Sequence, residues 1–466
     1  MSKKIVILGA GITGLVAAWR LASKGFDVEV VEKQPLGGGI GGSINHGDFI
    51  IDHGIHGVYA SRLETIPVVE EMVRTFGQDF LTVEKKTSIY FNGQYLKYPL
   101  GVKEIFQALP ITTSVKCSMD FVSARLKKRL WGSSDGESFQ EWVEDRFGPR
   151  LYQIYFGPYV EKVWGIPGSQ MSSLWLARRV EELSLISVLK RAILGLLVPS
   201  YRDNEMRSLQ PLTFLYAPKG SGQYTERVRQ AAENAGARIS YETEVTRLIM
   251  DGRRVTGAEI RKGDFREIRP LDFFISTIPL PSLVKMLESI ADSETMDAAR
   301  KLRYRALVFV NLFINRSQVY RDQWVYYSDP AIPFIRVNEY TNLGPKFSPP
   351  GQTVLQCEVS CFTGDDIWSA SDQYLAEICL ASLENLGLVN RDEVFHSTVA
   401  RQSTAYPVFD VGCEAKLKRV LGFTDKLEEV FTLGRQGRFE YINMDECVWQ
   451  ATACYAEIAH REEQGP

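Results

Sequence analysis

The chain has 466 residues, of which 45% are apolar and 24% charged, so its composition is that of an ordinary globular protein with ample core. Its 54 basic and 57 acidic side chains give a net charge of −3, which argues against nucleic acid as the main partner. The seven cysteines are scattered without a CxxC pair, which is typical of reduced thiols in a cytoplasmic protein. We therefore expect neither a disulfide framework nor a bound metal.

Residues 183–198 are the most membrane-like part of the sequence. No run of about 18 apolar residues occurs in the chain, so no transmembrane helix is expected. The segment is interrupted by Lys190 and Arg191, and three basic residues lie upstream at 127–129. Two interpretations stay open, a basic surface helix that contacts a membrane and a helix that packs within a substrate domain. The expected location is therefore the cytoplasm, with peripheral membrane contact as the open alternative.

The first 32 residues predict a dinucleotide-binding βαβ unit. A strand over residues 5–8 runs into a glycine turn, a helix follows over residues 15–23, and a second strand over residues 28–31 ends at Glu32. A GxGxxG turn alone is weak evidence, but here both strands, the helix and the terminal acid agree with it. We expect the helix N-terminus to bind phosphates and Glu32 to accept from the ribose hydroxyls.

Each glycine of this turn has its own expected role. Gly9 allows the tight turn, Gly11 lets the backbone approach a pyrophosphate, and Gly14 lets the helix pack close to the strand. A second glycine run, residues 37–39, follows soon after the acid. In many FAD proteins such a pair lets the chain cross the diphosphate again, whereas NAD-binding domains usually lack it. The expected cofactor is therefore FAD.

A histidine-containing segment follows at residues 52–59. The chain has five histidines, and three of them lie within residues 46–56. Isolated histidines are usually structural, so this clustering favours a site.

The rest of the chain predicts one nucleotide domain built from distant pieces. No second glycine-turn unit with a strand before it and an acid after it occurs, so a separate nicotinamide domain is not expected. Residues 62–200 are mostly helical in pattern, and short strands alternate with turns from about residue 237 onward. The predicted class is α/β, with a Rossmann-like, glutathione-reductase-like FAD-binding domain, a helical insertion and an antiparallel-sheet substrate domain. The expected boundaries are 1–70 with 205–285 and 400–466, then 71–204, then 286–399.

With these elements in place, the chain resembles the amine-oxidase/protoporphyrinogen-oxidase superfamily of flavoproteins, and within it the UDP-galactopyranose mutases and their uncharacterised relatives. The similarity is carried by the opening fingerprint and by four further segments. These are residues 54–56, matching the mutases' GxH; 159–165, matching YxxKxWG; 302–305, matching their YR; and 406–410 with 434–445, matching YPVxD and GRxGxYxYxxMD. Asn443 replaces an Asp common in the mutases, and residues 58–60 depart from their aromatic-His continuation.

The resemblance implies a set of cofactor-binding residues spread over the chain. They are Gly9, Gly11, Ile12, Thr13, Gly14, Glu32, Lys33, Gly38, Gly39, His56, Gly57, Val245, Gly434, Arg435, Tyr441, Asn443, Met444 and Asp445.

The resemblance also implies a substrate site and its catalytic residues. Substrate binding falls to Tyr159, Trp164, Arg179, Arg305, Tyr406 and Tyr441, with Arg178 as the second choice for the third position. His56, Arg305 and Arg435 are the expected catalytic residues. A sugar diphosphate needs cations and hydroxyl donors that converge, and this set supplies them. For Tyr159 and Trp164, core packing at helical spacing stays an equal alternative.

Three functional hypotheses remain open. In the first, reduced FAD is a covalent catalyst that isomerises the ring of a nucleotide sugar, as in the mutases. In the second, FAD takes hydride from a small or lipid-linked substrate, as in the amine-oxidase/protoporphyrinogen-oxidase group. In the third, the protein binds flavin without catalysis. The oligomeric state is not predicted.

Overall fold

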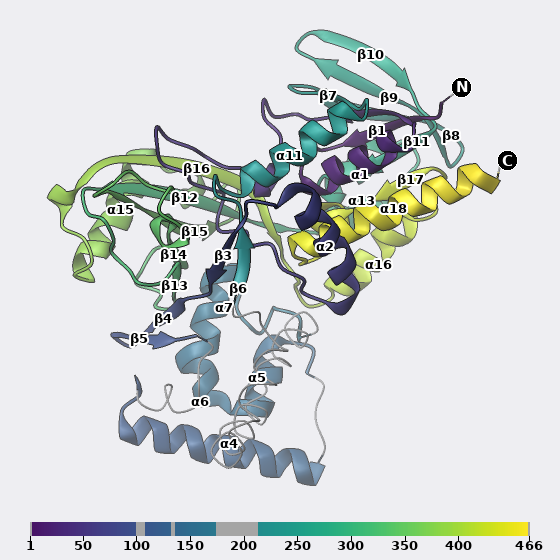
Figure 1. Ribbon diagram of the computed structural model, residues 1–466. Coiled ribbons are helices and arrows are strands. Elements are labelled where there is room, and N and C mark those ends of the chain that lie inside the picture. Colours follow the sequence, from purple (N-terminus) through teal and green to yellow (C-terminus); the bar gives the residue numbers. More distant parts are fainter. Residues whose placement is uncertain (1, 99–107, 132–135, 174–212, 465–466) are drawn as a thin grey trace. The chain divides into compact units, whose positions relative to one another are not determined.

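The computed structural model describes residues 2–98, 108–131, 136–173 and 213–464 (Figure 1). Its contacts group the chain into two compact units. Unit 1 comprises Met1–Thr82, Leu215–Arg303 and Ala415–Pro466, and unit 2 comprises Val83–Phe214 and Tyr304–Glu414. The chain passes between them within β3 (Leu81–Glu84) and β6 (Thr213–Tyr216), which pair with each other. The three-domain division expected above stays a prediction, and Arg178, Arg179 and residues 183–198 lie outside the described residues.

A parallel sheet of five strands forms the centre of unit 1. Its order is β17 (Val430–Thr432), β11 (Phe273–Ser276), β1 (Lys4–Leu8), β2 (Asp27–Val31) and β7 (Arg238–Ser240). β1 is buried on both faces, as expected for a central parallel strand. Ile5 and Ile7 pack with the helices on one face, while Val6 and Leu8 pack on the other.

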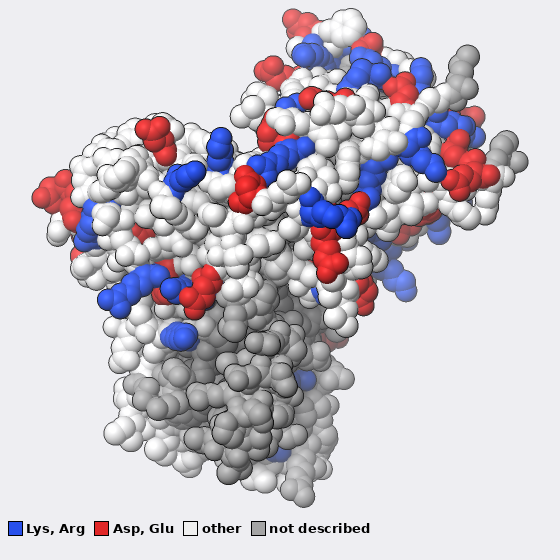
Figure 2. Space-filling model, viewed as in Figure 1, with Lys and Arg blue, Asp and Glu red and all other residues white. Residues whose placement is uncertain are grey.

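Helices and a small antiparallel sheet cover this central sheet. The helices that share its first apolar cluster are α1 (Ile12–Ser23), α2 (Ile66–Phe76), α11 (Ser221–Asn234) and α18 (Met444–Gln464). The second cluster includes residues of β8 (Glu244–Asp251), β9 (Arg254–Lys262) and α12 (Leu280–Met286). β10 (Phe265–Pro270) completes the antiparallel sheet, and α13 (Ser293–Arg300), α16 (Cys413–Thr424) and α17 (Gly434–Gly437) complete the helices described here. Lys, Arg, Asp and Glu are interspersed over the face of unit 1 drawn in Figure 2, in keeping with the small net charge.

Unit 2 is built on a seven-stranded sheet. The order is β16 (Val394–Pro407), β12 (Tyr304–Ile314), β15 (Thr353–Cys361), β14 (Arg336–Glu339), β13 (Trp324–Tyr327), β4 (Thr87–Phe91) and β5 (Gln94–Lys97). All neighbours are antiparallel except β13 and β4. Strands β4 and β5 come from a stretch expected to be mostly helical. The alternating burial along β4 shows that a period of two prevails there.

The two faces of this sheet differ in chemistry. One face is apolar, contributes Val308, Val310 and Val359 to a buried cluster, and packs against α15 (Asp372–Asn385). The other face carries Arg305 and further polar side chains on the alternate positions of the same strands. Because the parallel sheet of unit 1 and the mostly antiparallel sheet of unit 2 occur together with helices, the predicted α/β class is confirmed. The glutathione-reductase-like architecture stays a prediction.

Within the described residues of unit 2, four α-helices lie between β5 and Gly165. They are α4 (Ile111–Trp131), α5 (Phe139–Phe147), α6 (Pro149–Leu151) and α7 (Gly157–Trp164), with a π-helical turn at Tyr152–Phe156 between the last two. A further short helix, α14 (Asp366–Ser369), follows β15.

Candidate functional site

The glycine turn after β1 has the geometry that the sequence predicts. Gly9 has a φ of +105°, which glycine adopts without strain, and its N–H donates to the carbonyl of Val31 at 2.9 Å. A Cβ on Gly14 would lie 2.0 Å from the carbonyl oxygen of Gly9, so only glycine allows α1 to approach the turn. A Cβ on Gly11 would meet nothing within 4 Å, so this glycine borders open space. Gly14 is therefore required for packing, whereas Gly11 leaves space that a ligand could occupy.

Two distant glycine segments join this turn. Gly38 donates its N–H to the carbonyl of Ala10 at 2.8 Å, and Gly38 and Gly11 form a parallel bridge. Gly434 has a φ of +79°, and a Cβ there would lie 2.7 Å from the hydroxyl oxygen of Thr13 in the first turn of α1. Residues separated by more than 400 positions therefore form one glycine-lined surface at the N-terminus of α1.

The acid at the end of β2 is fixed beside the same turn. Glu32 accepts from the N–H groups of Ala10 and Gln34, each at 2.8 Å, one on each carboxylate oxygen. Each oxygen keeps a second lone pair for a ligand hydroxyl. Lys33 next to it is exposed, and Val245 is buried in the apolar cluster under β1 and β2.

The histidine segment is held by a buried carboxylate. Asp52 accepts from the hydroxyls of Ser43 and Tyr216 and from the N–H of Ser221 at the start of α11. Burial raises the pKa of Asp52, an effect that these three donors oppose. Burial lowers the pKa of His53, whose Nδ1 lies 3.2 Å from the carbonyl oxygen of Gly42.

His56 lies on the next turn of this segment. Its Nε2 is 3.1 Å from the carbonyl oxygen of His53. Val58, two residues on, forms an antiparallel bridge with Leu215, so the backbone on both sides of His56 and Gly57 is anchored.

The C-terminal segment contains α17 and continues through a turn to the start of α18. Arg435 donates from Nε and Nη2 to the carbonyl of Ile442 and lies 5.0 Å over the ring of Tyr441. The N–H of Asn443 donates to the Glu446 carboxylate, and a Cβ on Gly41 would lie 3.7 Å from Cε of Met444. Arg435 thus holds the turn that contains three of the expected cofactor residues.

Asp445 anchors α18 to the chain before α2. Its Oδ2 accepts from the N–H and hydroxyl of Ser61 and from the hydroxyl of Thr65. Its Oδ1 is buried without a hydrogen-bond partner among the described residues.

In unit 2, Arg305 is buried where α7 meets the polar face of the sheet. Only 3% of Arg305 is exposed, and its Nε donates to the carbonyl of Val163 at 3.1 Å and to the hydroxyl of Ser360 at 3.0 Å. The guanidinium lies 4.3 Å over the ring of Phe362. A Cβ on Gly165, where α7 ends, would lie 2.3 Å from Nη1 of Arg305. Glycine at that position is therefore required by the buried cation.

Two of the expected substrate residues adjoin Arg305. Tyr406 on β16 pairs directly with Arg305 on β12, and the ring of Trp164 meets the ring of Tyr406 edge-on at 5.9 Å. Tyr159 instead stacks on Tyr155 at 6.5 Å, farther back along α7. Sequence reasoning grouped both aromatics of the YxxKxWG segment, whereas the structure brings Trp164 to Arg305 and Tyr406.

A second guanidinium on this sheet, the half-buried Arg336, was missed by the sequence analysis. Its Nη2 donates to Glu358 at 2.6 Å, and Tyr406 acts electrostatically on it. The Glu358 carboxylate holds the pKa of Arg336 well above its usual range. Nε of Arg336 and Oε2 of Glu358 are buried without hydrogen-bond partners among the described residues. The available signal was the charged residues within two otherwise mainly buried strands, Arg336 and Glu339 in β14 and Glu358 in β15.

Lys162 on α7 has a shifted pKa, which predicts how the stability of the protein changes with pH. Its Nζ donates to the carbonyls of Tyr327 and Asp329 at 2.9 and 2.8 Å, and burial lowers its pKa to about 7. In the unfolded chain the pKa is near its ordinary value of about 10.4, so between pH 7 and 10 the unfolded state binds more protons. The free energy of unfolding should therefore rise by roughly 2–4 kcal/mol from pH 7 to pH 10.

Urea denaturation of the wild type and of Lys162→Met at pH 7, 8, 9 and 10 isolates this contribution. The difference between the two proteins should grow with pH in favour of the wild type. A difference that stays constant over this range would contradict the assignment.

With both sites described, comparison with known proteins decides the family. The profile of the family described as flavin containing amine oxidoreductase matches residues 12–415. The chain belongs to this family. Its cofactor is accordingly FAD, as the sequence predicts, and the protein is a flavin-dependent enzyme of the oxidoreductase superfamily.

Individual relatives differ in activity. The chain is 24% identical over 388 residues to the zeta-carotene-forming phytoene desaturase of Myxococcus xanthus (76% of this chain, 71% of that protein). It is 27% identical over 180 residues to the "Probable UDP-galactopyranose mutase" of Klebsiella pneumoniae (38% and 45%). It is 26% identical over 161 residues to protoporphyrinogen oxidase 2 of Arabidopsis thaliana (34% and 32%). The matches thus span less than half the length of the latter two relatives.

A solved structure shares the fold over nearly the full length. The crystal structure of reduced UDP-galactopyranose mutase superposes with a TM-score of 0.80 at 21% identity and covers 98% of this chain and 96% of that one. The predicted resemblance to the superfamily, and within it to the mutases, is confirmed at the level of the fold.

The residues of unit 1 fit the cofactor of this family. No described side chain caps α1, so its first N–H groups face the open space that Gly11 borders. A helix N-terminus of this kind binds phosphate groups. The segments at Gly9–Gly14, Gly38 and Gly434 would hold the diphosphate of FAD, and Glu32 would hold a ribose.

Proposed function

We propose that this family member binds a nucleotide sugar and isomerises its sugar ring with reduced FAD. The observation that carries the proposal is a pair of guanidiniums on one face of one sheet, the buried Arg305 and the half-buried Arg336. A tyrosine hydroxyl and an indole adjoin this pair. Two cations in a partly dehydrated site suit a diphosphate, which carries at least two negative charges.

Each residue of the unit 2 cluster then has a defined task. Arg305 and Arg336 neutralise the diphosphate, and the hydroxyl of Tyr406 donates to one of its oxygens. Trp164, which is 4% exposed, closes one side of the cluster against water.

Unit 1 supplies the reactive group. Reduced FAD, when bound, provides a nucleophile for the anomeric carbon of the sugar, so no side-chain nucleophile is required. His56 and Arg435 are the unit 1 residues that we assign to catalysis. Arg435 keeps Tyr441 and the turn before α18 in place, and the main-chain bridge at Val58 fixes the backbone beside His56.

The proposal predicts binding of UDP and a specific loss in one variant. Tyr406→Phe should weaken UDP binding about 5- to 10-fold, because one hydrogen bond to an anionic acceptor is lost while the ring contact with Trp164 stays. Calorimetric titration with UDP measures the change. Tyr374→Phe on α15, where the side chain is 54% exposed, is the matched control and should bind UDP like the wild type.

Turnover provides the direct test. Protein reduced with dithionite should interconvert the pyranose and furanose forms of UDP-galactose, as followed by anion-exchange chromatography, whereas the oxidised protein should not. Absence of both UDP binding and interconversion would refute the proposal.

An oxidoreductase that takes hydride from a small or lipid-linked substrate is the second candidate. The long match to a phytoene desaturase favours it, because that match covers 76% of this chain. Departures from the mutase pattern at residues 58–60 and at Asn443 also favour the oxidoreductase alternative. Consumption of oxygen with an amine or a polyene substrate, without affinity for UDP, would establish this alternative.

A further inference from the structure

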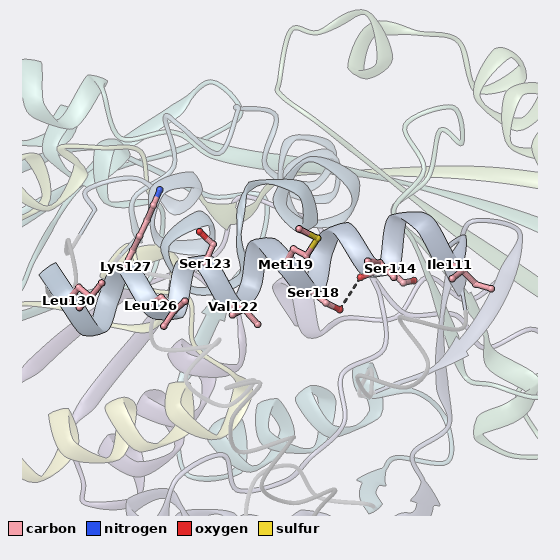
Figure 3. A pocket seen from close by; sticks show the side chains of 10 residues that line it. Ile111, Ser114, Ser118, Met119, Val122, Ser123, Leu126, Lys127 and Leu130 are labelled. Carbon is pink, nitrogen blue, oxygen red and sulfur yellow. Dashed lines mark hydrogen bonds between the residues drawn. The ribbon is translucent and has the colours of Figure 1, made fainter.

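One face of α4 is apolar and exposed along the whole helix. Its stripe repeats every three or four residues and so falls within an arc of about 100° on one side of the helix, running along it for about 28 Å. Its members, with their exposed fractions, are Ile111 (83%), Val115 (53%), Met119 (66%), Val122 (54%), Leu126 (55%) and Leu130 (69%). Figure 3 shows side chains along α4, with Ile111, Met119, Val122, Leu126 and Leu130 of this stripe labelled. A continuous stripe of this kind marks an interaction surface.

The opposite face of α4 fixes the helix in unit 2. Cys117 and Ala124 are buried, at 6% and 8% exposure, on the side that packs against α5 and α6. Asp120 on the same side pairs with Arg150 of α6 at 3.5 Å. The apolar stripe is therefore not needed to attach α4, and its exposure calls for a partner.

The charges of α4 indicate the chemistry of that partner. The helix carries five basic residues and one acidic residue within a chain of net charge −3. Lys116 and Lys127 are exposed on one flank of the stripe, and the single acid, Asp120, is neutralised by Arg150. An apolar stripe with a cationic flank suits the boundary between the head groups and acyl chains of an anionic membrane.

We propose that α4 docks the protein on an anionic lipid bilayer, with the stripe buried at the level of the head groups. No helix within the described ranges is long and apolar enough to cross a membrane, so this is contact with a surface. A second copy of α4 would bring two strongly basic helices together. Residues 174–212 carry six basic and four acidic residues, so their net charge of +2 does not complement the helix either. An anionic bilayer complements both the stripe and its cationic flank.

Sedimentation with vesicles tests the proposal on the full-length holoenzyme. The wild type should bind vesicles of phosphatidylcholine mixed with phosphatidylglycerol, and added salt should weaken the binding. Met119→Asp with Val122→Asp should lower the partition coefficient about tenfold or more, because two apolar side chains are lost from the buried stripe. Lys116→Gln with Lys127→Gln should lower it about 25-fold on the mixed vesicles and hardly at all on pure phosphatidylcholine.

The matched control changes exposed apolar residues elsewhere. Phe265→Asp with Ile268→Asp on β10, exposed by 62% and 59%, should bind vesicles like the wild type. Circular dichroism and the flavin absorbance verify that each variant is folded. Absence of binding to the mixed vesicles, or an equal loss in the control, would overturn the proposal. Light scattering that shows a dimer dissociated by Met119→Asp with Val122→Asp would assign the stripe to a second copy instead.

Discussion

Replacing Gly11 with alanine should leave the protein folded while reducing its affinity for FAD about 10- to 100-fold. The backbone at Gly11 has a φ of −75° and a ψ of 174°, which alanine adopts without strain, and a Cβ there meets no protein atom within 4 Å. The added methyl group therefore costs little in the apoprotein. It occupies the space next to the N-terminus of α1, where the phosphates would lie, and crowding of that kind costs about 1–3 kcal/mol. Titration of the apoprotein with FAD, followed by quenching of flavin fluorescence, measures the loss.

Gly14→Ala in the same turn is the control that distinguishes a loss of FAD binding from a loss of packing. Its Cβ would lie 2.0 Å from the carbonyl oxygen of Gly9, so α1 must move away from β1. We expect a lower melting temperature for the apoprotein as well as loss of FAD. If Gly11→Ala lowered the melting temperature as much as Gly14→Ala, Gly11 would be a packing residue and its assignment to the cofactor would fail.

Replacing Arg336 with methionine should destabilise unit 2 by about 3–5 kcal/mol and abolish UDP binding. Glu358 is fully buried, and Arg336 and Asn338 are its donors, both to Oε1, at 2.6 and 2.7 Å. Removing one partner of a buried ion pair leaves the other charge uncompensated, which is the costly event. Urea denaturation measures the first effect, and calorimetric titration measures the second.

A double variant separates the structural role of Arg336 from its role in binding. Arg336→Met combined with Glu358→Gln removes both charges, so most of the lost stability should return. UDP binding should not return, because the cation for the diphosphate is still missing. Recovery of UDP affinity in the double variant would show that Arg336 serves only to neutralise Glu358. Arg391→Met, which breaks an exposed pair with Glu377, is the control and should change neither property measurably.

The sequence was most informative where backbone conformation dictates residue type. Gly9 and Gly14 are readable because a positive φ and a close helix–strand approach exclude other residues. The two strands beside them follow from short apolar runs, and β1 and β2 lie where residues 5–8 and 28–31 predict them.

Side-chain convergence was harder to predict. Arg336 is separated from Arg305 by 31 positions, and its place beside Glu358 depends on the register of β14 with β15, which no local pattern specifies. The same holds for Asp52, whose donors Ser43, Tyr216 and Ser221 come from three separate segments. The resemblance to the mutase motifs identified Tyr406 and Trp164, whose rings are in contact. It also grouped Tyr159 with them, but the ring of Tyr159 stacks on Tyr155 instead.

The order of strands in unit 1 has a consequence for synthesis of the protein. β1 is made first, but its neighbour β11 follows about 265 residues later and the edge strand β17 later still. Unit 2 needs nothing beyond Glu414, so its sheet can form while the last part of unit 1 is still on the ribosome. Gly434 and α18 complete the glycine surface only after the sheet of unit 2 has been made. FAD capture should therefore come after the synthesis of unit 2, and until β17 is added the exposed edge of the parallel sheet is the part of the nascent chain most in need of a chaperone.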